Sequence, residues 1–248
     1  MLSIRGLNVA IRNVQILREV SLELPQGSMT GLIGRNGAGK TTLMKSLMGI
    51  LKAASGSVRF GDTDLLALAT HKRARLGIGY MPEDRRLIPE LTIEENILVP
   101  AWASGLRDAR ARLEKIYEYV PELTAEENIL APAWAARAPD AAARLQKAYT
   151  LVPEAREFAQ RKGSQLSGGQ QKLVALARAL VSGTKLLLLD EPFEGVAPAL
   201  AQRLAEVVAG LKKDGMSVIL SESDLQHSER LVDRVYVIDR GSVSLKER

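Results

Sequence analysis

The sequence predicts an α/β fold with a mostly parallel sheet, and three observations support this prediction. Short apolar segments typical of strands alternate along the chain with longer amphipathic segments typical of helices. One apolar segment, LLLLD at 186–190, is almost continuously hydrophobic, as strands buried on both faces of a parallel sheet are. Near the N-terminus, a glycine-rich loop joins a predicted strand directly to a predicted helix.

The predicted elements follow in a regular order. Apolar runs over the first 24 positions indicate two strands, and LPQG at 24–27 is a turn signal. MTGLI at 29–33 predicts a strand that enters the glycine loop, and the following helix is expected to stop at Gly49. Further strands are predicted at IGYM (78–81), KLLLLD (185–190), MSVILS (216–221) and RVYVID (234–239). Helices are predicted at 170–181, at 198–213 and, as a shorter one, around LQHSERLV (225–232).

Composition and charge exclude several classes of protein. The 248 residues, 46% of them hydrophobic and 25% charged, are enough for one large domain or a core with a subdomain. The chain has no cysteine, so a disulfide framework is excluded. The start MLSIRGLNVAIRN lacks the apolar region of a signal peptide, and no apolar run is long enough to span a bilayer, so we expect a soluble intracellular protein. The net charge is +5, but Lys and Arg are scattered, which favours a solvated surface over a nucleic-acid patch.

An internal repeat lies in the Ala-rich, helical stretch between about 90 and 160. Residues 89–120 (copy one) and 121–152 (copy two) are identical at 21 of 32 positions, which chance does not produce. Each copy predicts a T-x-x-E capping box, then a break at a proline, then an amphipathic helix. The capping boxes are Thr92 with Glu95 and Thr124 with Glu127, and the amphipathic helices begin near Asp108 and Asp140. Two copies are fewer than a solenoid needs, so we interpret them as a local tandem duplication.

The segment GRNGAGKTT at 34–42 matches the phosphate-binding pattern G-x-x-x-x-G-K-[ST] between a strand and a helix. Glycines let backbone N–H groups close around phosphate oxygens, and the positive end of the helix adds to the attraction. Lys40 is expected to reach the β and γ phosphates, and the Thr41 hydroxyl to bind Mg²⁺. An ordinary glycine turn with an incidental lysine is the disfavoured alternative. The predicted ATP-binding residues here are Gly34, Asn36, Gly37, Ala38, Gly39, Lys40, Thr41 and Thr42.

Two carboxylates follow the apolar strand LLLLD. Asp190 is expected to reach the Mg²⁺ coordination sphere, and Glu191 to orient or deprotonate an attacking water. An acidic pair at a strand end is usually a solvated loop or a helix cap, but the glycine loop in the same chain favours a nucleotide site. A second anion-binding end is predicted at LSGGQ (166–170), where Ser167 can cap a helix that starts with two glycines.

Together, the glycine loop, LSGGQ and the LLLLDE strand end resemble the ATP-binding cassette ATPases over nearly the whole chain. In that family two cassettes pair head to tail, so the LSGGQ of one chain caps the ATP held by the glycine loop of the other. The resemblance therefore implies that the two anion-binding ends belong to different halves of a shared site. The residues expected to contact the partner's nucleotide are Ser167, Gly168, Gly169 and Gln170.

The resemblance also implies the domain organisation. We expect a phosphate-loop NTPase core with an N-terminal antiparallel β subdomain and an inserted helical subdomain, together forming one domain over 1–248. Residues 1–86 and 165–248 are expected to form the core with its β subdomain, and residues 87–164 the helical subdomain with repeats 89–120 and 121–152.

Within the family, three stretches resemble the ATPase subunits of bacterial importers for branched-chain and other hydrophobic amino acids, whose relatives handle urea and aromatic acids. They are GYMPEDRRLIPELTIEENI, LLLLDEPFEGVAP and LSGGQQKLVALARAL. After GIGYMP the family usually has a glutamine that belongs to the metal site. In this subgroup that residue is often Glu, and this chain has Glu83 there. The implied partners are a second identical or related cassette and membrane-spanning permease subunits. The implied location is cytoplasmic, at the inner face of the cell membrane.

The chain departs from the family pattern at several positions. Where many cassettes stack adenine on an aromatic ring, this chain has Ile11, with Val14 nearby, so apolar contact alone would hold the base. Where the family most often has a switch histidine, SESD places Ser223, which can donate a hydrogen bond but lacks the reach and charge of histidine. His227 is either a substitute or a surface residue. The loop FEGVAP lacks the family's common aspartate, as it also does in the amino-acid importer subgroup.

The duplication lengthens the spacing between the glycine loop and the LSGGQ segment at 166–170, which is called the signature from here on. Gly34 and Ser167 are 133 residues apart, against roughly a hundred in relatives, so removal of one copy restores the family spacing. The second copy is either a tolerated insertion or a specialised surface for a partner.

Two other functions also stay open: a nucleotide-gated dimerisation module with little ATPase activity, and a soluble cassette that acts on DNA or ribosomes. Such soluble cassettes generally have tandem cassettes or long coiled-coil arms, which this chain lacks.

Overall fold

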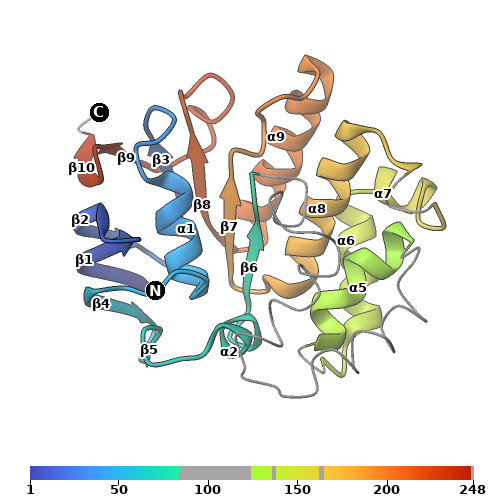
Figure 1. Cartoon of the computed structure of the whole chain (residues 1–248). Helices are drawn as coiled ribbons and strands as arrows, with labels where there is room; N and C mark the ends of the chain where they lie inside the picture. Colours follow the sequence, from blue (N-terminus) through green and yellow to red (C-terminus); the bar gives the residue numbers. More distant parts are fainter. Residues whose placement is uncertain (84–123, 136–137, 162–164, 247–248) are drawn as a thin grey trace.

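The structure, a computed structural model, describes residues 1–83, 124–135, 138–161 and 165–246. A four-stranded sheet at one side of the molecule is built from the N-terminal part of the chain (Figure 1). Its order is β2-β1-β4-β5, and every pair in it is antiparallel, as expected for the N-terminal β subdomain. Its strands are β1 (Leu2–Ile11), β2 (Val14–Leu24), β4 (Ser55–Phe60) and β5 (Thr63–Asp64).

A six-stranded sheet, in the order β10-β9-β3-β8-β7-β6, forms the centre of the molecule. All its pairs are parallel except β9 with β10, which are antiparallel at one edge. The prediction of a mostly parallel sheet is therefore confirmed. Its strands are β3 (Met29–Ile33), β6 (Ile78–Met81), β7 (Leu186–Asp190), β8 (Ser217–Glu222), β9 (Arg234–Asp239) and β10 (Ser242–Lys246).

The leucines of β7 alternate between two hydrophobic cores because successive side chains of a strand point to opposite faces. Leu186 and Leu188 belong to the core that contains α1 (Lys40–Met48) and the antiparallel sheet. Leu187 and Leu189 belong to the core that contains α8 (Gly168–Ser182) and α9 (Pro198–Lys213). Helices α1 and α8 therefore lie on opposite faces of the central sheet (Figure 1).

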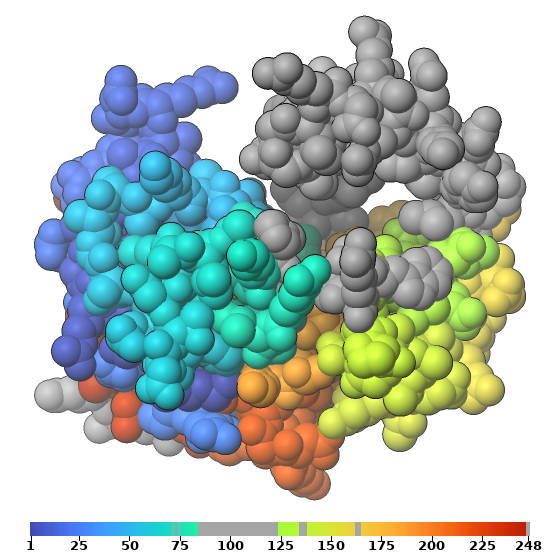
Figure 2. Space-filling view, turned by 90° about the horizontal axis from the view of Figure 1, so that it is seen from below, coloured from blue at the N-terminus to red at the C-terminus, as the bar shows by residue number. Residues whose placement is uncertain are grey.

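The described part of the helical subdomain comprises most of copy two of the repeat and the residues that follow it. Copy two contains α5 (Ala125–Ala135) and α6 (Ala141–Leu151), which both pack against α8, and α7 (Glu154–Glu157) comes after it. In the space-filling view, α5 lies on the side of the molecule opposite the N-terminal strands (Figure 2). The helix is amphipathic as expected: Leu145, Ala148 and Tyr149 of α6 are buried, and so is Val152 at its C-cap. Copy one, with Thr92, Glu95 and Asp108, lies outside the described residues.

The capping box of copy two is present. The backbone N–H of Thr124 donates to Glu127 Oε2 at 2.8 Å, and the N–H of Glu127 donates to Thr124 Oγ1 at 3.2 Å. The break expected at the proline is wrong, because α5 continues through Pro132 to Ala135. The proline stands near the end of the helix, and the neighbouring Ile129 and Ala133 are buried in the core, so packing offsets the missing hydrogen bond.

The short helix expected around 225–232 is also absent from the structure. Asp224 accepts a hydrogen bond from the backbone N–H of Gln226, and the N–H of Ser228 bonds to the carbonyl of Leu225. The Ser228 hydroxyl bonds back to the Glu222 carboxylate. These local bonds form a series of turns in place of a regular helix.

A short helix, α2 (Thr70–Arg75), precedes β6. No helix within the described ranges has the length and apolar character needed to cross a membrane.

Candidate nucleotide-binding and catalytic site

The glycine loop lies between β3 and α1, as the sequence predicts. The N–H of Gly34 donates to the carbonyl of Glu222 at 3.1 Å, which ties the start of the loop to the end of β8. A Cβ at position 34 would come within 2.3 Å of the Ile238 carbonyl oxygen, so only glycine fits there. Gly39 caps α1 with φ of 114°, a left-handed conformation that glycine adopts without strain.

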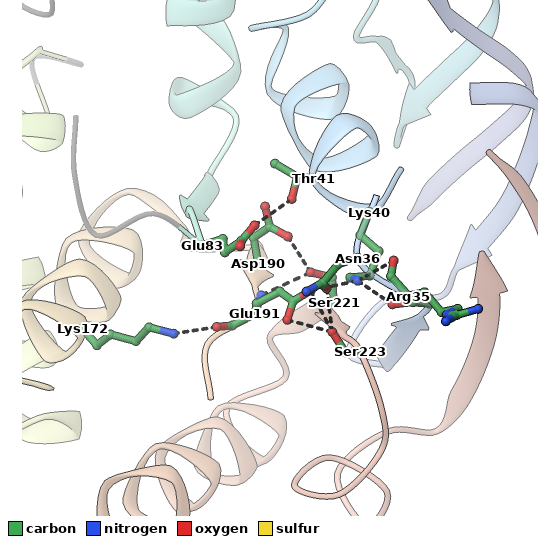
Figure 3. A network of polar contacts seen from close by, with 11 residues as sticks. Arg35, Asn36, Lys40, Thr41, Glu83, Lys172, Asp190, Glu191, Ser221 and Ser223 are labelled. Atoms are coloured by element: carbon green, nitrogen blue, oxygen red, sulfur yellow. Dashed lines mark hydrogen bonds and ion pairs between the residues drawn. The ribbon is translucent and has the colours of Figure 1, made fainter. Parts of the chain in front are cut away.

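Lys40, the first residue of α1, is almost completely buried at 4% exposure. Its ammonium donates to the carbonyl oxygens of Gly34 and Arg35, so the side chain folds back across the loop. It also forms an ion pair with Glu191, with 2.8 Å between Lys40 Nζ and Glu191 Oε1 (Figure 3). The structure therefore brings together the lysine and the glutamate that the sequence proposed for catalysis.

Asp190, the last residue of β7, is fully buried. Its carboxylate accepts hydrogen bonds from Ser221 Oγ at 2.6 Å and from the Tyr80 hydroxyl at 3.2 Å. Burial raises the pKa of Asp190, and the hydrogen bonds from Ser221, Thr41 and Tyr80 act in the opposite direction. Ser221 and Tyr80 were missed at the sequence level. A polar side chain at the end of an apolar strand is the signal that could have indicated them.

Thr41, Glu83 and Asp190 form a group of oxygen atoms beside the glycine loop. Thr41 Oγ1 lies 3.3 Å from Glu83 Oε2, and Thr41 is near enough to Asp190 to lower the pKa of that carboxyl group. Mg²⁺ prefers oxygen ligands and usually takes only one or two carboxylates from the protein. The three residues proposed as metal ligands are therefore close together, and their chemistry fits Mg²⁺.

Ser223 lies directly beside the proposed catalytic glutamate. Its hydroxyl is 3.3 and 3.4 Å from the two carboxylate oxygens of Glu191 and 3.0 Å from Asn36 Oδ1 in the glycine loop. His227, considered as a substitute for the switch histidine, packs its ring on Phe193 with centroids 5.5 Å apart. Ser223, in the position of the family's histidine, thus bridges the glycine loop and Glu191.

The signature segment forms the start of α8. Ser167 caps this helix, and its hydroxyl accepts a hydrogen bond from the N–H of Gln170 while the Gln170 side chain accepts one from the N–H of Ser167. The side chain of Ser167 is exposed. Because α1 and α8 lie on opposite faces of the sheet, the two predicted anion-binding ends start helices in different layers of the molecule.

Ile11 and Val14 face each other across the turn between β1 and β2. They are 38% and 61% exposed, among the few large hydrophobic side chains of the described residues that face solvent. Leu17, further along β2, lies beside the glycine loop, because a Cβ added to Gly39 would come within 2.9 Å of the Leu17 side chain. Ile11 thus belongs to the hairpin next to the glycine loop, and its contact with adenine stays a prediction.

The family model described as ABC transporter matches residues 17–194, and these residues are more than half of the chain. The chain belongs to the ABC transporter family. Within the family it is an ATPase cassette, in agreement with the combination of the glycine loop, the signature helix and the Asp190–Glu191 strand end.

Relatives of this ABC ATPase include subunits of different transporters. The chain is 34% identical over its whole length to the high-affinity branched-chain amino acid transport ATP-binding protein BraG of Pseudomonas aeruginosa, of which it covers 92%. It is 28% identical to the lipopolysaccharide export system ATP-binding protein LptB of Escherichia coli, with 97% of this chain and 87% of LptB covered. Among solved structures, a nucleotide-free ATP-binding cassette from an ABC transporter matches with a TM-score of 0.72 and 27% identity. That match covers 98% of this chain and 89% of the other.

Proposed function

We propose that this ABC transporter ATPase binds two Mg·ATP between two cassettes paired head to tail, hydrolyses them, and thereby drives membrane-spanning permease subunits between inward-facing and outward-facing states. The second cassette is an identical or a related chain, and the complex lies at the cytoplasmic face of the cell membrane. One observation carries the proposal. Lys40, Glu191 and Ser223 meet at the glycine loop, whereas Ser167 starts a helix on the other face of the sheet. A second chain is needed to bring a signature to that loop.

Each residue has a role that follows from its chemistry. Lys40 and the amides of the glycine loop bind the phosphates and stabilise the charge that develops during transfer. Thr41, Glu83 and Asp190 would hold Mg²⁺, which supplies further positive charge at the phosphates. Glu191 orients the attacking water and accepts its proton, and Ser223 holds the Glu191 carboxylate. Ser167, Gly168, Gly169 and Gln170 of the partner close the site around the γ phosphate.

For the transported solute, we propose a branched-chain or other hydrophobic amino acid, or a related small solute. The 34% identity to BraG over the full chain supports an importer of this class. LptB, which belongs to an export system, is less similar at 28%. The permease that co-purifies with this chain, reconstituted in vesicles with labelled leucine, tests the solute and the direction of transport together.

The two-chain site is tested by measuring ATP turnover per chain over a range of protein concentrations. We expect specific activity to fall on dilution, because a monomer would lack the signature that closes its own site. Addition of the Lys40→Met chain, whose signature is intact, is expected to restore some turnover to the dilute wild-type chain. A monomer that hydrolyses ATP at the full rate at high dilution would contradict the proposal.

A second candidate function is a nucleotide-gated dimerisation module with little turnover. Ser223, whose hydroxyl replaces the longer and chargeable histidine side chain beside Glu191, favours this candidate. Dimer formation on addition of Mg·ATP, measured by light scattering, without release of inorganic phosphate would support it. Stoichiometric dimers together with steady phosphate release would support the ATPase.

A further inference from the structure

Lys172 is a buried cation on the signature helix. Its side chain is 2% exposed and extends from α8 toward the turn that follows β7 (Figure 3). A buried ammonium is stable only when its donors are satisfied. Lys172 Nζ donates to three backbone carbonyls of that turn: Glu191 at 2.7 Å, Pro192 at 3.1 Å and Glu194 at 2.7 Å. The ammonium has enough N–H donors for these three acceptors, which all lie in one turn of the backbone.

That turn begins with a residue in an unfavourable conformation. Glu191 has φ of 48°, in the left-handed region that residues with a Cβ seldom adopt. The peptide group before Glu191 is held by Ser221, whose carbonyl and hydroxyl oxygens accept from the Glu191 N–H at 3.1 and 3.2 Å. The peptide group after it is held by Lys172. With both flanking peptides held, the Glu191 side chain leaves the backbone toward Lys40 and Ser223.

We propose that Lys172 is a positioning residue for ATP hydrolysis, which holds the left-handed turn at Glu191 and so directs the Glu191 carboxylate at the attacking water. The inference rests on the proposed role of Glu191 in hydrolysis. Lys172 does not touch the nucleotide-binding loop through any of these contacts. It acts through the backbone of the residue that orients the water.

The same lysine links the turn to the signature. Lys172 follows Ser167 by five positions, which corresponds to about 7.5 Å along a helix that rises about 1.5 Å per residue. Helix α8 therefore connects two functional ends of one chain: the signature at its start, which caps the partner's nucleotide, and the turn that holds Glu191. A shift of α8 during closure of the dimer would be transmitted through Lys172 to the water-orienting carboxylate of the same chain.

The test uses the full chain and the variants Lys172→Met and Lys172→Gln. Met keeps much of the volume but donates no hydrogen bond, whereas the Gln amide keeps two donors on a shorter side chain. We expect kcat to fall by about 10²-fold in Lys172→Met, the scale of loss associated with a misplaced catalytic group. Lys172→Gln is expected to lie between this variant and the wild type. Neither variant should raise the KM for ATP, because the glycine loop is untouched and a displaced Glu191 carboxylate competes less with ATP for Lys40. Lys213→Met, an exposed lysine on α9, serves as the matched control and should keep wild-type kinetics.

A double-mutant cycle separates positioning from a general loss of structure. If Lys172 acts through Glu191, the Lys172→Met change lowers the single-turnover rate of the wild type but has little further effect on Glu191→Gln. Equal reductions in both backgrounds would overturn the proposal, and so would an unchanged kcat or an effect confined to KM.

Circular dichroism and thermal unfolding establish whether each variant folds. If Lys172→Met does not fold, Lys172→Gln decides: a lower kcat without a rise in KM supports the proposal, and wild-type kcat overturns it. The experiment distinguishes failure of the proposed function from failure of this inference alone. A wild-type chain without any turnover would overturn the ATPase and this inference together, whereas active wild type with equally active Lys172 variants would overturn this inference alone.

Discussion

Lys40 and Glu191 form a buried ion pair, with 2.8 Å between Nζ and Oε1 and side-chain exposures of 4% and 6%. In the proposed site Lys40 would also bind the phosphates of ATP, so a bound nucleotide would compete with Glu191 for the same ammonium. The pair keeps both charges compensated in a buried place, where an unpaired charge would be costly. On the proposed function, nucleotide binding would rearrange this contact and leave Glu191 free to orient water.

The first prediction concerns the variant Glu191→Gln. We expect ATP turnover to fall by about 10²–10⁴-fold, the range associated with loss of a general base. At the same time the affinity for Mg·ATP should rise several-fold, because the amide no longer competes as an anion for Lys40. Phosphate release and binding of a fluorescent ATP analogue measure the two effects. Glu206→Gln, at an exposed position of α9, is the control and should change neither. Equal turnover in Glu191→Gln and wild type would remove Glu191 from its role.

The second prediction concerns Ser223, whose hydroxyl contacts both Glu191 and Asn36. Ser223→Ala removes a hydrogen bond to a charged carboxylate, a class of bond that contributes about 1.5–3 kcal/mol. The Ser223–Glu191 bond is long at 3.3 Å, so we take the lower end of this range and expect turnover to fall by about tenfold. Ser223→His restores the residue type that the family most often has here, and we expect turnover above that of the wild type. His227→Ala is the control, since the His227 ring packs on Phe193. Steady-state phosphate release at saturating ATP compares the variants, and a loss confined to His227→Ala would show that the wrong residue was assigned.

Much of the fold and site could be predicted from the sequence because short local patterns determine them. The glycine loop, the LLLLD strand and the Ser167 cap each occupy a few consecutive residues whose conformations follow from local chemistry. The contacts of Lys172 could not be predicted in this way, because its acceptors are backbone carbonyls about 20 positions away. Backbone acceptors leave no signal in the residue types. The left-handed φ of Glu191 could not be predicted either. Glycine is the usual sequence signal for this conformation, and here the residue is a glutamate.

The two errors in secondary structure have a common cause, which is tertiary context. Pro132 is a helix breaker by its own chemistry, but the burial of Ile129 and Ala133 keeps α5 intact around it. The segment 225–232 has helical periodicity, but the Ser228 hydroxyl is bonded to the buried Glu222 carboxylate and the segment folds as turns. Neither packing against a distant element nor a bond to a preceding strand can be inferred from periodicity.

The third prediction is a pH dependence of stability that arises from Glu222. Burial, with the nearby charges of Asp224 and Glu191, raises the pKa of Glu222 from 4.5 to about 7, although the hydrogen bond from Ser228 opposes this. The folded chain therefore keeps this proton at pH values where the unfolded chain has lost it. The free energy of unfolding should consequently fall as the pH rises from about 4.5 to about 7 and level off above that range.

Urea unfolding at a series of pH values measures this effect in wild type and in Glu222→Gln. The glutamine variant should show a weaker fall over the same range, and it should gain stability relative to wild type as the pH rises. Asp190, whose pKa is also raised by burial, contributes a slope of the same sign to both chains, so the difference between the two chains isolates Glu222. Glu229→Gln, at an exposed position, should behave as the wild type does. Parallel curves for wild type and Glu222→Gln would show that Glu222 titrates normally.

The fourth prediction concerns which copy of the repeat can fill the helical subdomain. In copy two, Ala125 and Ala148 are 0% and 1% exposed in the core formed with α8. The corresponding residues of copy one are Ile93 and Ile116. Placing these larger side chains into the same packed positions would overfill the core, at a cost of about 1–3 kcal/mol for each site. Copy two is therefore the better fit to α8.

Deletion of either copy leaves the same flanking junctions, because the residues before 89 and after 152 are unchanged. We expect the chain without 89–120 to fold with a urea midpoint close to that of the full chain, and the chain without 121–152 to be less stable. Ile93→Ala with Ile116→Ala in the latter chain should recover much of the difference, which assigns the loss to these two positions. If the chain without 121–152 proves as stable as the chain without 89–120, the packing around Ala125 and Ala148 does not discriminate between the copies. A chain that folds without 121–152 but no longer supports transport would favour a specialised partner surface over a tolerated insertion.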